Sequence, residues 1–259
     1  MLAKLTVRDL YPLALAEGEG MGTAYEYYVK RVALGKLLLR MEPPRSVLIA
    51  GLPEKYGASL DFVLLATELG AQLTVVDDRQ HAVERLRQGL HTLARMAGAP
   101  RLSPPAVTLL AGFDSLETIQ SRFDLALSSE VLQRLGPEAR ASYIAWLRQS
   151  ARALALFCPN ADNEAHNSRS GLAGLRLEEM RAMLVAGEEQ EGRGAVGYID
   201  MPPFPPGITR SAEQREDATS GRFEAFVMWG LGRYARLEKF IPAAVRRRQS
   251  HIVYAWRGG

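Results

Sequence analysis

Polar and small residues stand at the ends of several short apolar runs in this sequence. Gly51 follows the first run, Asp77 the second, and Ser128-Ser129-Glu130 the fourth. Glycine allows a tight turn and a close approach of the backbone to a ligand. A carboxylate at Asp77, 26 residues after Gly51, can accept hydrogen bonds from both hydroxyls of a ribose. These residue types predict a site for a nucleoside.

An aromatic side chain and an acid follow the third run. Phe113 offers a flat apolar face and Asp114 a neighbouring carboxylate, a pair suited to the ring and the amino edge of adenine. Each residue also has a structural interpretation: Phe113 as part of the core, and Asp77 with Asp78 as caps of the helix that follows. The nucleoside interpretation gains because these positions all follow predicted strands.

The apolar runs alternate with longer helical patterns. The expected strands are residues 46–50, 72–76, 106–110, 123–127 and 153–157, and the expected helices are 58–69, 79–96 and 130–147, the last interrupted near Gly136-Pro137. Strands that are apolar throughout, in βαβα order, indicate a parallel sheet with helices on both faces. Ligands bind such a sheet beyond the carboxyl ends of its strands. The polar residues at these ends should therefore meet along one edge.

Less regular segments flank this alternation. A glycine-rich turn at 17–22 and an aromatic helix at 25–39 form an N-terminal preface. After residue 160 we expect helices at 177–186, 223–234 and 237–247, strands at 195–200 and 251–256, and a rigid proline-rich turn at 202–207. We see no reason to cut the chain into two domains. The preface spans 1–42, and the helices before the last strand form an insertion within 161–259.

Three segments resemble the class I S-adenosylmethionine-dependent methyltransferases. They are the strand and glycine VLIAG, the acid-terminated TVVDD, and FDLALSSEVLQRL. The resemblance runs from about Ser46 to Asn160, with a weaker likeness at 251–256. It implies a Rossmann-like, doubly wound α/β fold with a mostly parallel sheet, S-adenosyl-L-methionine as methyl donor and S-adenosyl-L-homocysteine as product. Residues 43–160 would then be the cofactor-binding core of a single domain, 1–259.

The resemblance also implies roles for single residues. Asp77 and Asp78 would lie at the ribose, Phe113 and Asp114 at the adenine, and Gly51, Leu52, Glu54, Gly57, Ser128 and Ser129 at the methionine moiety. Two positions depart from the family pattern. Ile49 stands where an acid is usual, and Pro53 stands where a second glycine is usual. We therefore expect the methionine end to be held differently, by Glu54 or by the preface.

Methyl transfer requires a general base only where the acceptor must lose a proton. By position, Glu130, Asp162 and His166 are the candidates for such a base. The substrate-side candidates are Tyr25, Tyr28, Asn163 and His166, because the preface and the loop after the fifth strand would lie beside the ligand. The structural alternatives are a core-packing aromatic helix and an ordinary surface histidine.

Composition and charge narrow the class of protein. The chain has 259 residues, 47% of them hydrophobic, and a formal net charge of +3. From Phe223 onward there are seven basic and two acidic side chains, a tail of +5. A basic tail on a near-neutral body differs from the broad cationic surface of a protein that wraps nucleic acid. Arg246-Arg247-Arg248 either meets an anionic acceptor or complements the dipole at a helix end.

One cysteine and four scattered histidines argue against a disulfide framework and a structural zinc site, so no metal site is predicted. Cys158, after a buried strand, is expected to be an inert core thiol. The apolar segment at 11–16 is short and flanked by charges, unlike an export signal. The longest uncharged run, 102–113, is far shorter than the ~18 residues of a membrane span. We expect a cytoplasmic protein without a membrane span.

Two other functions share this layout. A nicotinamide-dependent oxidoreductase should carry G-x-G-x-x-G after the first strand, and Gly51-Leu52-Pro53 breaks that pattern. A methyltransferase-like module that binds a partner without catalysis is favoured by the unusual first turn. The sequence favours a small-molecule acceptor over a macromolecule, does not identify the methylated atom, and leaves a nucleic-acid partner and a homodimer open.

Overall fold

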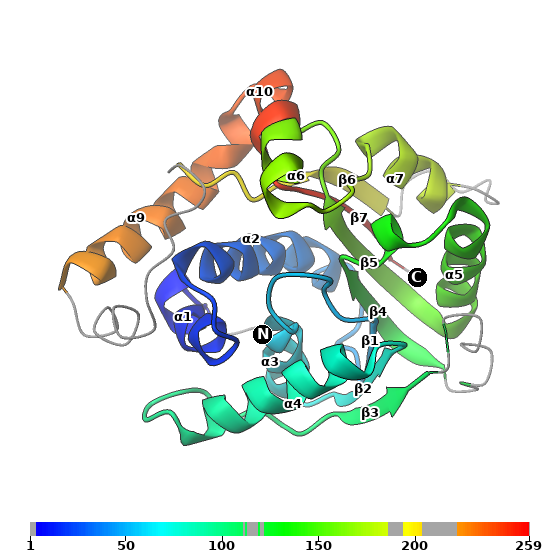
Figure 1. Cartoon of the computed structure of the whole chain (residues 1–259), viewed down its shortest axis with the longest axis horizontal. Coiled ribbons are helices and arrows are strands. Elements are labelled where there is room, and N and C mark those ends of the chain that lie inside the picture. Colours follow the sequence, from blue (N-terminus) through cyan, green and yellow to red (C-terminus); the bar gives the residue numbers. More distant parts are fainter. Residues whose placement is uncertain are drawn as a thin grey trace.

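Seven strands form one sheet, in the order β3-β2-β1-β4-β5-β7-β6, in a computed structural model of the chain (Figure 1). The structure describes residues 4–110, 112, 119, 122–185, 194–203 and 222–258. The strands are β1 (Ser46–Ala50), β2 (Gln72–Asp77), β3 (Ala106–Leu109), β4 (Phe123–Ser129), β5 (Ala151–Pro159), β6 (Gly194–Ile199) and β7 (Ile252–Arg257). Each of them coincides with a strand predicted from the sequence.

The first five strands run parallel, and β7 lies antiparallel between β5 and β6. From β1 the sheet grows through β2 to β3, and from β4 it grows the other way to β5, so the order reverses between β1 and β4. Open α/β sheets bind ligands beside such a switch point. We call the edge at the carboxyl ends of β1 to β5 the carboxyl edge. Because β7 is antiparallel, its start and the end of β6 also lie there.

Helices cover both faces of this sheet. They are α1 (Val7–Ala16), α2 (Met21–Leu38), α3 (Leu60–Leu69), α4 (Gln80–Arg95), α5 (Pro137–Ser150), α6 (Glu164–Ser170), α7 (Leu177–Val185), α9 (Arg222–Leu237) and α10 (Ala243–Gln249), with 3-10 turns η2 (Leu132–Arg134) and η3 (Glu238–Phe240). Buried side chains of α1 to α4 and α9 pack on one face, and those of α5 and α7 pack on the other, the two layers seen on either side of the sheet in Figure 1. This is the predicted Rossmann-like, doubly wound architecture.

The N-terminal preface consists of two packed helices rather than a glycine-rich turn and one helix. Thr6 caps α1 through a reciprocal pair of hydrogen bonds with Asp9. The next helix, α2, begins at Met21, earlier than expected, with Gly20 as its N-cap. Glycine has a low helix propensity, and the glycines of this segment explain why the sequence predicts a later start for this helix. Apolar side chains of both helices belong to the larger core.

Two other differences bear on the carboxyl edge. The predicted helix 130–147 divides into η2 and α5, because Pro137 takes the first position of α5. The polar loop after β5 contains the short helix α6, which the sequence pattern did not indicate. Phe113, Asp114 and the proline-rich turn beyond Pro203 lie outside the described residues. Among the described helices, none has the length and apolar character to cross a bilayer.

Candidate functional site

The loop after β1 turns sharply at the switch point of the sheet. Gly51 has a φ of 82°, a conformation that side-chain-bearing residues rarely adopt. Its amide donates to the carbonyl of Val76, 2.7 Å away on the neighbouring strand. The chain then runs through Gly57, which also has a positive φ of 70°, to the first residue of α3, Leu60. Glycine at the first position is therefore required by the turn itself.

Asp77 ends β2 beside this loop and is fully buried. Its Oδ2 accepts a hydrogen bond from the amide of Leu52 at 2.6 Å, and its Oδ1 accepts one from the amide of Arg79 at 2.8 Å. The α4 helix begins after Arg79 without a side-chain cap. Asp77 therefore joins the first loop to the end of β2 instead of capping the helix.

The guanidinium of Arg79 makes two further hydrogen bonds to Asp77, one to each carboxylate oxygen. Nε lies 2.9 Å from Oδ1, and Nη2 lies 3.0 Å from Oδ2. Arg134 adds a longer contact of 3.5 Å to Oδ2 and pairs with Asp78 at 2.9 Å. A carboxylate offers about four lone-pair positions. The side chains and amides of this chain thus fill the accepting capacity of Asp77.

Side chains from two directions hold the backbone of the loop 51–57. Arg79 and Arg85 donate to carbonyls of the loop from the start and the first turns of α4, at distances of 2.6 and 2.8 Å. Glu130, just after β4, accepts from the amides of Glu54 and Lys55 at 3.0 and 3.2 Å. Glu130 has a φ of 54°. The loop, which has Pro53 where the family pattern has a second glycine, is thus fixed by contacts across the switch point.

The two serines at the end of β4 each contact a helix. The hydroxyl of Tyr143 lies 2.5 Å from the carbonyl of Ala50 and 2.8 Å from Ser128 Oγ, so it donates to the carbonyl and accepts from the serine. Ser129 Oγ accepts from Nζ of Lys30 at 2.9 Å. Neither η2 nor α5 has a side-chain cap. Both serines therefore bond to side chains of α5 and α2 and do not cap the helices that follow β4.

A buried ionic cluster lies next to Ser129. Lys30 of α2 is 2% exposed and pairs with Glu26 one turn earlier. Burial raises the pKa of Asp61 to about 7 and that of Glu130 to about 7, and the charge of Glu26 adds to both shifts while Lys30 opposes them. Carboxyl groups that exchange protons near neutral pH therefore stand close to the switch point.

Asp162 and Asn163 tie α6 to the segment before β7. Asp162 forms an ion pair with Arg247, with both nitrogen–oxygen distances at 3.0 Å. Asn163 caps α6 by accepting from the amide of His166 at 3.0 Å, and its side-chain amide donates to the carbonyl of Gln249 at 3.0 Å. These contacts explain both residues structurally. Their roles as base and as substrate-side residue stay predictions.

His166 stacks on a second histidine, His251. The ring centres are 4.1 Å apart and the planes differ by 16°. Burial, with the neighbouring charge of His251, lowers the pKa of His166 to about 4, so this imidazole is neutral at pH 7. Nδ1 of His251 lies 3.0 Å from Oδ2 of Asp200. The structure therefore places the predicted His166 in a cluster whose other members were not predicted.

The two tyrosines expected beside the acceptor lie within the core. Tyr25 is fully buried, and its hydroxyl donates to Glu238 of η3. Tyr28 is 7% exposed. Core packing of α2, the alternative interpretation of its aromatic residues, accounts for these positions. A role of either tyrosine toward an acceptor stays a prediction.

Several polar residues of this edge were not selected from the sequence. They are Glu26, Lys30, Asp61, Arg79, Arg134, Tyr143, Asp200 and His251. Most of them lie in helices whose periodicity predicts packing and says nothing of charge partners across the fold. Three of them could have been selected by their position at or next to the end of a predicted strand. Arg79 follows the acids at the end of β2, Asp200 follows β6, and His251 precedes β7.

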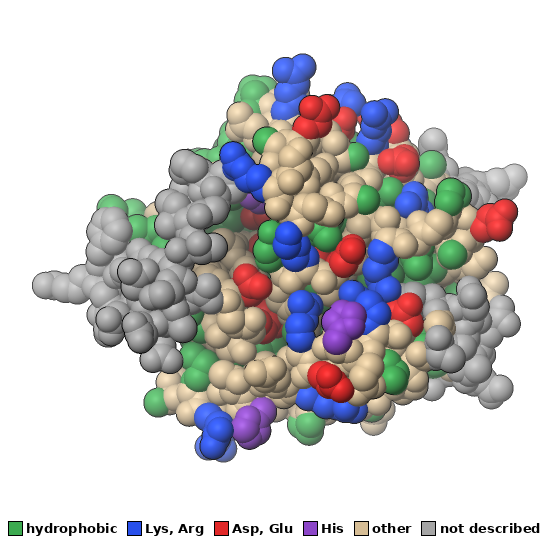
Figure 2. Space-filling model, viewed as in Figure 1, with side chains coloured by type: hydrophobic (Ala, Val, Ile, Leu, Met, Phe, Trp, Pro, Cys, Tyr) green, Lys and Arg blue, Asp and Glu red, His purple; other side chains and the backbone are tan. Residues whose placement is uncertain are grey.

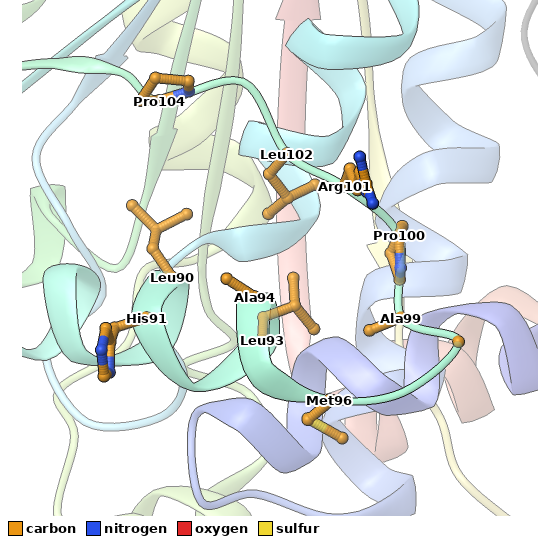
Figure 3. A pocket seen from close by; sticks show the side chains of 11 residues that line it. Leu90, His91, Leu93, Ala94, Met96, Ala99, Pro100, Arg101, Leu102 and Pro104 are labelled. Atoms are coloured by element: carbon orange, nitrogen blue, oxygen red, sulfur yellow. The ribbon is translucent and has the colours of Figure 1, made fainter.

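A cavity of about 640 Å³ opens at the opposite edge of the sheet, between the end of α4 and the segment leading to β3 (Figure 3). Leu90 and Leu93 of α4 face Leu102 across it. None of the residues expected to do chemistry lines this cavity. Within the described ranges, no group of three histidine, cysteine or acidic side chains is arranged to bind a metal ion, and Cys158 is buried with a free thiol.

Basic and acidic side chains lie next to one another over the centre of the face shown in Figure 2. The described part of this face has no broad patch of one sign. The pattern agrees with the near-neutral charge of the chain outside its basic tail. The described residues of this face therefore offer no continuous basic surface to a polyanion.

Comparison with solved structures identifies the fold. Magnesium protoporphyrin IX methyltransferase (ChlM) from Synechocystis PCC 6803 with bound SAH is 14% identical, with a TM-score of 0.50 over 90% of this chain and 84% of that chain. The methyltransferase domain of bacterial CtHen1 is 14% identical, with a TM-score of 0.49 over 88% of this chain and 97% of that chain. TehB from Haemophilus influenzae is 13% identical, with a TM-score of 0.45 over 88% and 61%.

No protein-family model matches the sequence, and no curated protein matches it. The chain nevertheless has the class I methyltransferase fold that the three sequence segments predicted. Identities this low establish the fold alone. The structural comparison gives no support to the nicotinamide-dependent alternative.

Proposed function

We propose that this chain is an S-adenosylmethionine-dependent methyltransferase that binds its methyl donor at the carboxyl edge, over the ends of β1, β2 and β4. The observation that carries the proposal is the two-point contact of Arg79 with Asp77. The guanidinium presents one donor to each carboxylate oxygen. The vicinal hydroxyls of a ribose present the same pair of donors.

The residues at this edge fit the nucleoside end of the donor. The Arg79 side chain is 16% exposed, so it has a route to solvent when a ligand takes its place. The amides of Leu52 and Arg79 keep the Asp77 carboxylate oriented after the guanidinium leaves. Gly51 leaves the turn without a side chain beside the ligand.

A sulfonium donor supplies an activated methyl carbon, so the protein mainly has to align the reactants and exclude water. Arg85 and Glu130 make the loop 51–57 rigid, which favours alignment. Lys30, bonded to Ser129, brings α2 over the end of β4 and closes that side. We propose a small molecule as acceptor, because the described residues on the face in Figure 2 form no broad basic patch.

A second candidate function is a methyltransferase-fold module that binds a partner without a methyl donor. One observation favours it: Asp77 has no accepting position left, and the Glu130 carboxylate already occupies two amides of the first loop. In this second function no ligand displaces the contact of Arg79 with Asp77 or the contacts of Glu130 with the first loop. The two candidates differ in one measurable property, the affinity for S-adenosylhomocysteine.

Isothermal titration calorimetry with S-adenosylmethionine and S-adenosylhomocysteine tests the proposal. We expect the wild type to bind both ligands. Asp77→Asn should weaken each by about 100-fold, because the amide keeps one accepting oxygen and loses the charge. A folded wild type that binds neither ligand would overturn the proposal and leave the second candidate.

The matched control is Asp124→Asn. Asp124 lies at the opposite end of β4, where it accepts from the amides of Arg45 and Ser46 at 2.9 and 3.1 Å. This variant loses a carboxylate that holds backbone, as Asp77→Asn does, and should keep wild-type affinity. Thermal unfolding of both variants separates loss of binding from loss of fold.

A further inference from the structure

His251 and Asp200 face each other at the end of a strand ladder. Ile199, the last residue of β6, pairs with Ile252, the first residue of β7. The next positions outward on these antiparallel strands are Asp200 and His251, and the amide of His251 donates to the carbonyl of Asp200 at 2.7 Å. Both residues therefore lie at the carboxyl edge, on the side of β5 away from β1.

The contact between these two side chains places one proton of the imidazole. Nδ1 of His251 lies 3.0 Å from Oδ2 of Asp200. An ionised carboxylate only accepts, so Nδ1 carries a hydrogen, and in the neutral ring Nε2 has a free lone pair. Among the described residues Nε2 has no hydrogen-bond partner, and the side chain is 17% exposed while that of Asp200 is 6% exposed. A ligand can therefore contact the imidazole of His251, whereas the carboxylate of Asp200 is almost inaccessible.

Two connections relate this pair to the proposed cofactor edge. On one side, Lys55 of the first loop donates to the carbonyl of Ser170 at the end of α6, the helix whose His166 stacks on His251. On the other side, Lys30 links Ser129 at the end of β4 to Glu26. The charge of His251 lowers the pKa of the Glu26 carboxyl, so the two side chains lie close together. The histidine ring therefore lies against α6 and close to the Glu26 carboxyl of α2, at the carboxyl edge of the sheet.

We propose that His251, oriented by Asp200, is the general base that takes the proton of the methyl acceptor; this inference rests on the proposed function. The acceptor atom loses its hydrogen as a proton to Nε2 while it bonds to the methyl carbon. The bond from that carbon to sulfur breaks, and its electron pair stays on sulfur, giving the neutral thioether. The proton leaves the imidazolium to solvent afterwards. No oxidant or further reactant is required.

The surroundings of His251 suit such a base. Burial of the ring lowers its pKa, but the Asp200 carboxylate, with smaller contributions from Glu26 of α2 and Glu238 of η3, outweighs burial and raises the pKa above its ordinary value. The remaining neighbour, His166 of α6, is neutral at pH 7. Asp200 can stabilise the imidazolium that forms, as the acid of a catalytic pair does.

The test uses the charge difference between the two ligands and needs no knowledge of the acceptor. S-adenosylmethionine carries a positive sulfonium, and S-adenosylhomocysteine a neutral sulfur at the same place. If His251 faces the reacting centre, its pKa should be lower by about 1 to 2 in the first complex than in the second. Nuclear magnetic resonance of histidine-labelled protein measures this value for all four histidines, with His→Gln variants for assignment.

His91 supplies the internal control, because it lies exposed near the far end of α4, at the opposite edge of the sheet. Its pKa should be the same in both complexes. Equal pKa values of His251 in the two complexes would overturn the inference while leaving the proposed function intact. If neither ligand binds, the proposed function fails, and the inference fails with it.

A second measurement addresses the proton transfer itself. Cell extract is incubated with donor labelled in the transferred methyl group, and with wild-type, His251→Gln or His91→Gln protein. A general base contributes about 100-fold or more, so His251→Gln should lose at least that factor in labelling rate, and His91→Gln should lose nothing. Labelling by His251→Gln at the wild-type rate would overturn the role of the imidazole.

Discussion

Arg79 takes, on the Asp77 carboxylate, the two positions that a ribose needs. The contact is buried on the Asp77 side and partly exposed on the Arg79 side. A hydrogen bond to a charged group contributes roughly 1.5 to 3 kcal/mol, so displacing the guanidinium costs part of the binding free energy of any nucleoside. The affinity of this chain for the proposed cofactor should therefore depend on Arg79, which competes with the ribose for Asp77.

Substituting this residue tests the competition directly. Arg79→Met keeps most of the side-chain volume and removes the donors. If a ribose displaces the guanidinium, the variant should bind S-adenosylhomocysteine about tenfold more tightly, equivalent to about 1.4 kcal/mol, as measured by calorimetry. Unchanged or weaker binding would show that Arg79 does not compete for Asp77.

Arg85→Met is the matched control for this substitution. Arg85 lies on α4, just after the N-cap Arg79, and donates to carbonyls of the same loop, at 3.2 Å to Pro53 and 2.8 Å to Gly57. None of its hydrogen bonds goes to Asp77. Its loss should loosen the loop and lower the affinity. The two arginines should thus have effects of opposite sign, which a general change of charge cannot produce.

At the scale of elements, the preface completes the first loop and the start of α3. The carboxylate of Glu17, in the link between α1 and α2, accepts from the amide of Leu60 at 3.0 Å and from the hydroxyl of Tyr27. Ser59, the N-cap of α3, has a left-handed conformation and makes no side-chain cap. Glu17 therefore caps α3 from a distant part of the chain, by accepting from the amide of its first residue.

Gly57 lies against this contact, and its substitution should separate the preface from the loop. Gly57 has a φ of 70°, and an added Cβ would overlap the Tyr27 hydroxyl and come within 3.0 Å of the Glu17 carboxylate. We expect Gly57→Ala to lower the free energy of unfolding by about 2 kcal/mol or more, measured by urea denaturation. Gly35→Ala is the control, because a Cβ there meets no neighbouring atom and should stabilise α2. Equal stability of Gly57→Ala and wild type would contradict this packing.

The strands and the edge that carries the polar residues could be predicted, because buried parallel strands are continuous apolar runs and the residues after them must share one edge. The partners of those residues could not be predicted. Whether Arg79 folds back onto Asp77 or extends into solvent depends on side-chain torsions that no periodicity records. Asp200 and His251 meet only because β6 and β7 pair antiparallel in a particular register, and that register is a property of the folded sheet.

Considered as a whole, the molecule buries ionisable groups between the preface and the sheet. Burial raises the pKa of Glu17 to about 8, and those of Asp61 and Glu130 to about 7, from ordinary values of 4.5, 3.8 and 4.5. Lys30 belongs to the same buried group and pairs with Glu26. Its single positive charge cannot neutralise Glu26 and the other three carboxyl groups as well. The folded protein therefore holds protons that the unfolded chain releases.

The sign of the resulting pH dependence follows from proton counting. A carboxyl whose pKa is raised on folding contributes its full stability below the ordinary pKa, and this contribution is lost as the pH rises toward the folded pKa. His166 has the opposite effect, because its pKa falls to about 4 from 6.5, but that effect is confined to pH values below about 6.5. Between pH 6.5 and 8 the buried carboxyls therefore lower the stability as the pH rises. His251, whose pKa is also raised, lowers it in the same direction.

We therefore expect the free energy of unfolding to fall between pH 6.5 and 8, by about 1.4 kcal/mol per pH unit for each carboxyl still protonated in the folded state. Urea denaturation at constant ionic strength measures the slope. Glu17→Gln should flatten it most near pH 8, since Glu17 has the highest of the three pKa values and an uncharged amide has no proton to lose. Glu138→Gln, an exposed position at the start of α5, should leave the slope unchanged. Stability that rises over this interval would mean that the carboxyls beneath the preface are ionised in the folded state and paired more strongly than their contacts indicate.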